Sequence, residues 1–317
     1  MYYLGVDLGG TNIAIGLVNE KYEIVLKDKV RTGAARPTGE IMDDMANLCK
    51  SIVERAGVSM EEVASVGIAA PGSIDPVSGY VRYSNNIKMS NYPIADELKK
   101  RLNIGKVYLE NDANAAALAE AKAGAGKGCS SLIMITLGTG VGGGIVIDGK
   151  LYSGFNYTGA ELGHTVIEFG GRPCTCGRRG CFEAYSSATG LINMTKEKMV
   201  DDVNSLMWDF ARNNLDNVSG RTAFDAAKKG DRSAKLVVDQ YIKYLACGLT
   251  NMVNIFQPEV LCIGGGVCGE GDYLLKPLTK NIRRMEYGST TQTKFCQIKI
   301  AELGNDAGII GAALLGL

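Results

Sequence analysis

The sequence predicts an α/β protein of two lobes, each with a mixed β-sheet covered by helices. Its length of 317 residues suits two domains better than one. Two apolar hairpins with glycine-rich turns, at residues 2–19 and 130–152, each open a succession of strands and helices. The second half of the chain therefore resembles the first in organisation, although the sequence identity between the halves is weak.

The first half begins with the strands YYLGVDL and IAIGLVN, which flank the turn GGTN, and EIVLKDKVRT follows as a third strand. Apolar residues at helical spacing then predict a helix that ends at a glycine. The predicted elements, in order, are strands at 2–8, 13–19 and 23–32, a helix at 38–57, a buried strand at 63–72, a helix at 94–102, a strand at 106–110 and an alanine-rich helix from about Ala113.

In the second half, SSLIMITLGTGVGGGIVIDGKLY gives two strands around a glycine-rich turn, and EVLCIGG gives a later strand, with helices between them. The last segment, LGNDAGIIGAALLGL, predicts a helix of small residues. Gly308, Gly311 and Ala312 would let this helix lie tightly against another element.

Charge and composition favour a small-molecule partner. Thirty-four basic residues balance thirty-four acidic residues, so no net field draws the protein to nucleic acid or to an anionic membrane. The N-terminus lacks the basic and apolar regions of a secretory signal, which predicts a cytoplasmic protein. Residues 128–147 are uncharged, but five glycines between 138 and 144 argue against a transmembrane helix. Six of the nine cysteines are scattered in apolar sequence, as expected of reduced core residues.

Three glycine-rich segments are candidates for binding phosphate or nucleotide. In DLGGT, backbone N–H groups and Thr11 could hold phosphate oxygens with Asp7 near magnesium, although an ordinary hairpin turn explains this segment equally well. LGTGVGGG is followed by a strand, which favours a second phosphate hairpin over a dinucleotide fold. GGGVCG (264–269) lacks the acidic strand end of a dinucleotide site, because Glu286 lies in helix-like sequence. A fourth match, GAGKGCS, is discarded because Gly128 replaces the hydroxyl residue that binds magnesium.

The segment YLENDANAAALAEA places Glu110, Asn111 and Asp112 between a strand and a helix. An isolated Asp before alanines is most often a helix N-cap. The alternative is a carboxylate placed to accept a proton from a substrate hydroxyl.

The chain's only histidine and three of its cysteines form a candidate zinc site, made of His164, Cys174, Cys176 and Cys181. Three thiolates and one imidazole fill a tetrahedron, so the metal would be structural, with Arg178 and Arg179 offsetting thiolate charge. Three reduced thiols without a metal are the alternative. The flanking carboxylates suit a polyhydroxylated ligand, and they belong to Glu161 and Glu183.

Together, DLGGT, END, LGTGVGGG, GAELGH, CTCGRRGCFE and GNDAGIIGAA resemble the ROK family of sugar kinases and sugar-responsive repressors. The resemblance runs from residue 5 to the C-terminus. It implies the two-lobed actin-like and hexokinase-like (ribonuclease H-like) fold, with ATP and a hexose bound in a cleft between lobes. The small lobe would comprise residues 1–111 and 301–317, and the large lobe residues 112–300.

The resemblance also implies roles for individual residues. Asp112 would be the catalytic base. The residues implied to bind the sugar are Asn111, Asp112, Glu161, His164 and Glu183, and the residues implied to hold ATP and its Mg²⁺ are Asp7, Gly9, Gly10, Thr11, Asn12, Gly138, Thr139, Gly265 and Gly266. His164 would serve both the sugar and a structural Zn²⁺, whose other ligands would be the three cysteines.

The implied activity is ATP-dependent phosphorylation of a hexose at its 6-hydroxyl, with glucose as the expected sugar. N-acetylmannosamine, N-acetylglucosamine, mannose and fructose are alternatives, because kinases for these sugars share the motifs. A repressor of this family needs a DNA-binding segment before the first phosphate motif, and here that motif begins at Asp7. A nucleotide-dependent oxidoreductase is the third alternative. The resemblance implies a homo-oligomer, a dimer or a tetramer, without nucleic-acid or membrane partners.

Overall fold

The computed structural model describes residues 1–317, and the chain divides into two compact units. The first unit comprises Met1–Leu132, Gly144–Ala160 and Glu302–Leu317, and the second comprises Ile133–Gly143 and Glu161–Ala301. The units place residues 112–132 and 144–160 with the first sheet, whereas the predicted large lobe includes them. The predicted division into a small and a large lobe stays a prediction.

The first unit is built on a five-stranded mixed sheet in the order β3–β2–β1–β4–β8. β1 pairs antiparallel with β2, with Asp7 opposite Ala14, and parallel with β4. The strands are β1 (Tyr2–Leu8), β2 (Asn12–Asn19), β3 (Ile24–Arg31), β4 (Val63–Ala70) and β8 (Val107–Asn111). The helices of this unit are α1 (Thr38–Arg55), α2 (Ile94–Leu102), α3 (Asp112–Ala123) and α10 (Ala307–Leu314), with short 3₁₀ turns at Met60–Glu62 and Gly304–Asp306.

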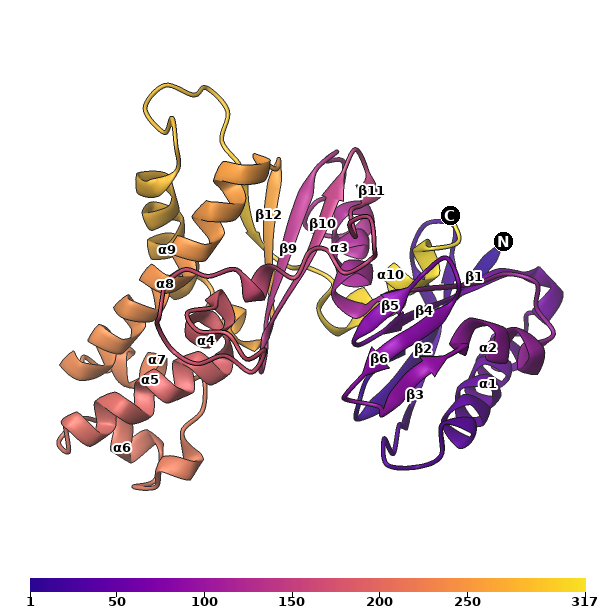
Figure 1. Ribbon diagram of the computed structural model, residues 1–317, viewed down its shortest axis with the longest axis horizontal. Helices are drawn as coiled ribbons and strands as arrows, with labels where there is room; N and C mark the ends of the chain where they lie inside the picture. Colours follow the sequence, from indigo (N-terminus) through magenta and orange to yellow (C-terminus); the bar gives the residue numbers. More distant parts are fainter. The chain divides into compact units, whose positions relative to one another are not determined.

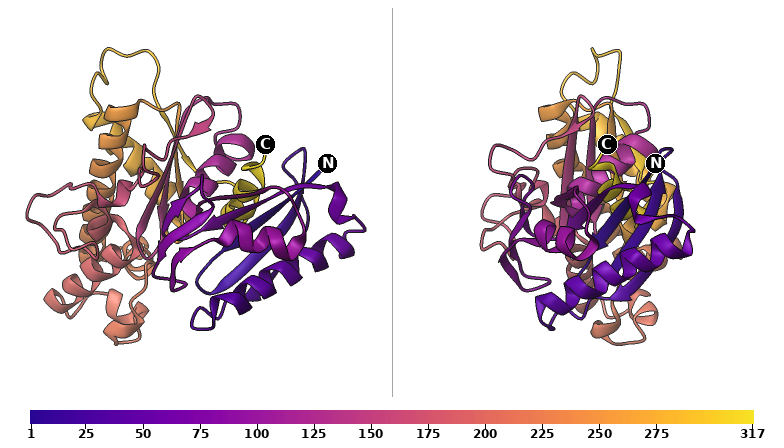
Figure 2. Two further views of the ribbon diagram at one scale, coloured as in Figure 1. Left: turned by 45° about the vertical axis from the view of Figure 1, so that its right-hand side comes forward. Right: turned by 90° about the vertical axis from the view of Figure 1, so that its right-hand side faces the viewer.

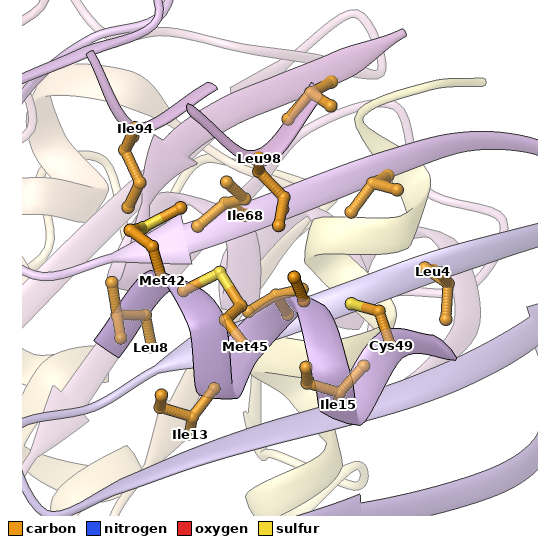
Figure 3. Packing of buried hydrophobic residues seen from close by; sticks show 14 of the residues in the cluster. Leu4, Leu8, Ile13, Ile15, Met42, Met45, Cys49, Ile68, Ile94 and Leu98 are labelled. Carbon is orange, nitrogen blue, oxygen red and sulfur yellow. The ribbon is translucent and has the colours of Figure 1, made fainter. Parts of the chain in front are cut away.

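Apolar side chains between this sheet and helices α1 and α2 form the main core of the first unit (Figure 1, Figure 3). In α1, Met42, Met45 and Cys49 recur at helical spacing and are fully buried, and they pack over Ile13 and Ile15 of β2. Each large apolar side chain buried in this way stabilises the fold by about 1.5–3 kcal/mol. The pattern that predicted the helix is therefore the pattern that attaches it to the sheet.

On the other side of the sheet, α10 packs so closely that glycine is needed where it crosses β1, β4 and α3. A Cβ atom at Gly5 would lie 1.9 Å from the carbonyl oxygen of Ile309, and one at Gly67 would lie 1.8 Å from that of Ala312. A Cβ atom at Gly311 would lie 1.9 Å from the carbonyl oxygen of Ala115 in α3. The predicted close approach of the C-terminal helix is confirmed, and Figure 2 shows both chain ends in this unit.

A small antiparallel sheet in the first unit was not predicted. It contains β5 (Ser73–Asp75), β6 (Tyr80–Ser84) and β7 (Met89–Tyr92) in that order. These strands have three to five residues each, too few to show the alternation that identifies a strand.

The second five-stranded sheet has the order β11–β10–β9–β12–β13, with β12 and β13 parallel. Its strands are β9 (Leu132–Leu137), β10 (Val141–Ile147), β11 (Lys150–Leu151), β12 (Val260–Gly264) and β13 (Gln297–Ile300). The helices of the second unit are α4 (Phe182–Ser186), α5 (Ala188–Asp201), α6 (Met207–Phe210), α7 (Thr222–Lys228), α8 (Arg232–Phe256) and α9 (Asp272–Met285), with 3₁₀ turns at Leu162–His164 (η2), Leu215–Asn217 and Gly266–Glu270 (η4).

The predicted α/β class with mixed sheets and the predicted hairpins are confirmed. Element ends shift by one or two residues, except that the C-terminal helix, predicted in residues 303–317, covers only Ala307–Leu314. The uncharged segment 128–147 forms strands β9 and β10, and none of the helices is both long and apolar enough to span a bilayer. Glu286 follows α9 as its C-cap, one residue beyond the helix in which it was predicted. None of the nine cysteines forms a disulfide. Of the six scattered ones, predicted to be reduced core residues, four are buried and two are half-buried, the latter being Cys129 and Cys247.

Gly311→Ala tests the close packing of α10. We expect the variant to lose about 1–3 kcal/mol or more of unfolding free energy in urea titrations, because its methyl group meets the rigid backbone of α3. Gly39→Ala in the first turn of α1 is the matched control, because nothing lies within 4 Å of its Cβ position. It should leave stability unchanged or raise it by about 0.5–1 kcal/mol. Equal stability of the two variants would contradict the close contact.

Candidate functional site

The DLGGT segment forms the turn between β1 and β2, and it is braced from the end of β3. The N–H of Gly9 donates to the carbonyl oxygen of Asn12 at 2.9 Å, which closes the turn. The buried hydroxyl of Thr32 donates to the carbonyl oxygen of Gly9 at 2.6 Å, and its N–H donates to that of Thr11 at 2.9 Å. Two bonds from a neighbouring strand therefore fix the conformation of the proposed phosphate hairpin.

Asp7 lies at the end of β1 beneath the N-terminus of α10. A Cβ atom at Gly308 would lie 2.6 Å from the Asp7 carboxyl carbon, so no side chain separates the helix from the acid. Burial, and secondarily the charge of Asp112, raise the pKa of Asp7 to about 6. Keeping this carboxylate ionised at neutral pH costs free energy. The electrostatic attraction of a bound cation would offset that cost.

The junction of β8 and α3 presents Asn111 and Asp112. Asn111, and not Asp112, is the N-cap: its side-chain oxygen accepts from the N–H groups of Ala113 at 2.9 Å and Asn114 at 3.3 Å. The alternative that Asp112 is the helix cap is therefore excluded, because its neighbour satisfies the helix end. The amide nitrogen of Asn111 donates to the carbonyl oxygen of Gly72 at 3.3 Å.

With the cap supplied by Asn111, the Asp112 carboxylate accepts only the N–H of Ala113, at 2.8 Å. The residue is reached by solvent, but the protein atoms around its carboxyl group displace part of the water there, and this desolvation raises its pKa. The preceding Glu110 is buried; it accepts from the N–H of Asn111 at 2.9 Å and from the Asn114 amide at 3.0 Å. Glu110 thus fixes the junction, while Asp112 keeps acceptor capacity for a substrate proton.

In the second unit, the LGTGVGGG segment forms the turn between β9 and β10 with Gly138 and Thr139 exposed. The start of α5 anchors it: the N–H of Ala188 donates to the carbonyl oxygen of Gly138 and the hydroxyl of Thr189 to that of Thr139, both at 2.8 Å. The turn therefore has a fixed shape that leaves its tip open to a ligand.

The GGGVCG segment packs against the end of β9. Gly265 has φ of 101°, and a Cβ atom there would lie 2.2 Å from the carbonyl oxygen of Leu137. Gly265 and Gly266 are exposed and lead into η4. The structure therefore brings the second phosphate turn and the predicted adenosine residues together in one unit.

His164, Cys174, Cys176 and Cys181 converge, with candidate donor atoms within 4.8 Å of one another. Nδ1 of His164 lies 3.7 Å from the sulfur of Cys174, and the sulfurs of Cys176 and Cys181 are also 3.7 Å apart. Neighbouring sulfurs on a tetrahedral zinc ion with bonds of ~2.3 Å are about 3.8 Å apart. The donor set and its spacing therefore fit tetrahedral zinc.

The loop that carries the cysteines turns at Gly177 and Gly180, which have φ of 85° and 83°, a region that favours glycine. The N–H and charge of Arg178 lower the pKa of the Cys176 thiol, whereas burial raises that of Cys181 to about 12. Arg178 thus offsets thiolate charge as predicted, but the guanidinium of Arg179 donates to the carbonyl oxygen of Gly170. A buried Cys181 thiolate would need a cation.

Three of the five residues predicted to bind the sugar lie in the second unit: His164 belongs to this cluster, and Glu161 and Glu183 flank it in the sequence. Glu161 is exposed and precedes η2, which contains His164. Glu183 lies in α4, and its carboxylate accepts from the N–H of Val141 at 3.0 Å and from the hydroxyl of Thr175 at 3.1 Å. Glu183 is therefore bonded both to the strand after the phosphate turn and to the cysteine loop.

Sequence reasoning missed the residues that support the site from a distance. Thr32 lies 23 residues from Gly9, and Thr175 lies eight residues from Glu183, with no periodic signal in either case. Asn86, in the loop between β6 and β7, lies 3.4 Å from a Cβ position at Gly10. In the sequence, only the two adjacent asparagines at 85 and 86 mark that loop, and in the structure Lys88 at its end has a φ of 53°.

Comparisons with known proteins find similarity over nearly the whole chain. The sequence pattern of the ROK family matches residues 3–317. Glucokinase of Thermotoga maritima is 40% identical over 98% of this chain and 95% of its own length. N-acetyl-D-glucosamine kinase of Haemophilus influenzae is 30% identical over 100% of this chain and 99% of its own length. The crystal structure of a ROK family glucokinase from Streptomyces griseus with glucose and AMPPNP gives a TM-score of 0.81 at 34% identity, covering 99% of each chain. The predicted actin-like α/β fold class is confirmed.

Asp7→Asn should make the metal-free protein more stable at pH 8. A carboxyl whose pKa rises from 3.8 to about 6 on folding favours the folded state only while it is protonated, so its contribution falls as pH rises through 6. A shift of about two units corresponds to roughly 3 kcal/mol. In urea titrations the gain should approach this value above pH 6 and vanish below about pH 4.

Asp28→Asn is the control of opposite sign, because Arg55 lowers the pKa of the exposed Asp28 carboxyl. Its stability at pH 8 should be slightly below that of the wild type. If Asp7→Asn is no more stable than the wild type at pH 8, then ionisation of the Asp7 carboxyl does not lower the unfolding free energy, and its pKa is not raised by folding.

Proposed function

The chain belongs to the ROK family, and from that premise we propose that it is an ATP-dependent hexokinase that converts glucose to glucose 6-phosphate. The Asp112 carboxylate carries the proposal. It has no capping role at the start of α3, because Asn111 supplies the cap, and desolvation raises its pKa, which favours uptake of a proton. The similarity to glucokinases over nearly the whole chain supports the same conclusion.

In the proposed reaction, Asp112 accepts the proton of the sugar 6-hydroxyl as that oxygen attacks the γ-phosphorus of ATP. A bond from the sugar oxygen to phosphorus forms, the bond from phosphorus to the β,γ-bridging oxygen breaks, and ADP leaves with that electron pair. General-base assistance of this kind contributes about 10²- to 10⁴-fold in rate.

The two glycine turns are proposed to hold the phosphates through backbone N–H groups, which stabilise charge that spreads over the γ-phosphoryl oxygens. The residues proposed for the nucleotide are Gly9, Gly10, Thr11 and Asn12 in the first turn, Gly138 and Thr139 in the second, and Gly265 and Gly266 at the adenosine. Magnesium bound with ATP would neutralise phosphate charge, and Asp7 would hold it, since a carboxylate oxygen is its preferred protein ligand.

Asn111, Glu161, His164 and Glu183 are proposed to bind sugar hydroxyls. Each oxygen of a carboxylate has two acceptor positions, so Glu183 keeps one on each oxygen beyond its bonds to Val141 and Thr175. With Nδ1 of His164 toward Cys174, the other ring nitrogen remains for a hydroxyl.

A structural zinc ion held by His164, Cys174, Cys176 and Cys181 is part of the proposal. With four protein donors the ion has no position for water or substrate, so its effect would come through the loop that it holds in shape. The predicted lobe division, a cytoplasmic location and a homo-oligomeric state also belong to the proposal.

An amino-sugar kinase is the second candidate, favoured by the 30% identity with N-acetyl-D-glucosamine kinase. A coupled assay with ATP, magnesium and a panel of glucose, mannose, fructose, N-acetylglucosamine and N-acetylmannosamine separates the candidates. We expect glucose to have the highest kcat/KM. An N-acetylated sugar that exceeds glucose by more than about tenfold would assign the enzyme to the amino-sugar kinases. Glucose binding without turnover of any sugar would favour a sugar-sensing regulator.

In the same assay, Asp112→Asn should lower kcat at least about 10²-fold while glucose affinity stays close to that of the wild type. The reason is that the lost carboxylate accepts the hydroxyl proton during the chemical step and not during binding. Glu97→Gln is a control carboxylate in the first unit, paired with Arg101 at the surface, and should keep full activity. Asp112→Asn activity within about threefold of the wild type would exclude Asp112 as the base.

Cys176→Ser should lose zinc, lower thermal stability and raise the KM for sugar, with the KM for ATP less affected. Elemental analysis should find about one zinc per wild-type chain, the number that one four-donor site holds. Cys247→Ser, outside the cluster, should keep both metal and activity. Fully active wild-type protein without zinc and with three titratable thiols would rule out the metal.

A further inference from the structure

Glu183 is held on both of its carboxylate oxygens by groups that belong to different segments. Oε2 accepts the N–H of Val141 in β10 at 3.0 Å, and Oε1 accepts the hydroxyl of Thr175 in the cysteine loop at 3.1 Å. A Cβ atom at Gly140 would lie 2.4 Å from Oε2, so only a glycine lets the turn approach this oxygen so closely. The orientation of this acid is therefore set by its surroundings.

Both bonds are needed because a glutamate carboxylate has little rotational preference of its own. The last torsion of the side chain is broad and roughly two-fold, so an unrestrained carboxylate samples many orientations. The Val141 bond fixes one oxygen and leaves rotation about that contact. The Thr175 bond removes this remaining freedom.

Thr175 makes the shorter of two contacts at Oε1. The sulfur of Cys174 lies 3.6 Å from this oxygen, whereas the hydroxyl of Thr175 donates to it at 3.1 Å. The hydroxyl is therefore the group that fixes Oε1.

We propose that Thr175 is a positioning residue for sugar binding, which acts by orienting the Glu183 carboxylate toward the hexose. This inference rests on the proposed hexokinase function. Thr175 itself is exposed between two of the cysteines and needs no contact with either substrate. Its hydroxyl holds Oε1 so that the second acceptor position on each oxygen is presented to sugar hydroxyls in a fixed geometry.

The test compares Thr175→Val, which removes the hydroxyl at nearly constant volume, with Thr175→Ser, which keeps it. The probe is glucose, measured as Kd by calorimetry on zinc-loaded protein and as KM in the coupled assay. For Thr175→Val we expect both constants to rise about three- to tenfold, the effect of one hydrogen bond to a charged group at an exposed position. The kcat and the KM for ATP should change less than about twofold, because the bond to Val141 is intact.

Thr175→Ser should bind glucose as the wild type does, and zinc content and melting temperature should be the same in all three proteins. A valine variant with unchanged glucose affinity would overturn the proposal, as would a serine variant as weak as the valine variant, because neither agrees with a role for the hydroxyl. Loss of zinc from the valine variant would assign the effect to the metal loop and also overturn it. If the wild type neither binds nor phosphorylates glucose, the proposed function fails first, and the inference fails with it.

Discussion

The contact of α10 with β1, β4 and α3 is the constraint on which the first unit depends. Backbone meets backbone at Gly5, Gly67 and Gly311, where a single added methyl group would overlap a carbonyl oxygen. This close approach sets the separation between the sheet and α3, and α3 begins at Asp112. The same helix covers the Asp7 carboxyl at Gly308. Packing of small residues thereby positions two acids that the sequence separates by about a hundred residues.

Both acids are kept in surroundings that favour their neutral forms. Burial raises the pKa of Asp7 to about 6 and desolvation raises that of Asp112, and the charge of Asp112 adds to the shift of Asp7. A protein selected for stability alone would place neutral side chains here. This unfavourable pair of acids is expected at a site where Asp7 binds a cation and Asp112 accepts a proton, because each event neutralises a negative charge.

Local patterns in the sequence predicted most of the fold, because helical spacing, hairpin turns and glycine placement act over a few residues. They failed for β5, β6 and β7, which are too short to show a period. For the site, the cysteine spacing predicted a cluster of four donors that the structure does bring together. The helix cap that the sequence offered at Asp112 is supplied by its neighbour Asn111, because either side chain can bond the helix end. The hydrogen bonds from Thr32 and Thr175 could not be predicted from the sequence, because the folded chain and not the sequence spacing brings each hydroxyl to its partner.

The donor chemistry of the two proposed cation sites keeps their ions apart. Thiolates and imidazole prefer zinc, whereas magnesium prefers carboxylate and phosphate oxygens with much of its water retained. A closed set of four zinc donors leaves the ion no vacancy for a phosphate, so zinc bound there has no place in phosphoryl transfer. The cysteine loop can still influence the reaction, because Glu183 bonds it to the strand that follows the second glycine turn. We therefore expect zinc to affect how well the sugar is held, while the chemical step depends on Asp112 and on the cation held by Asp7.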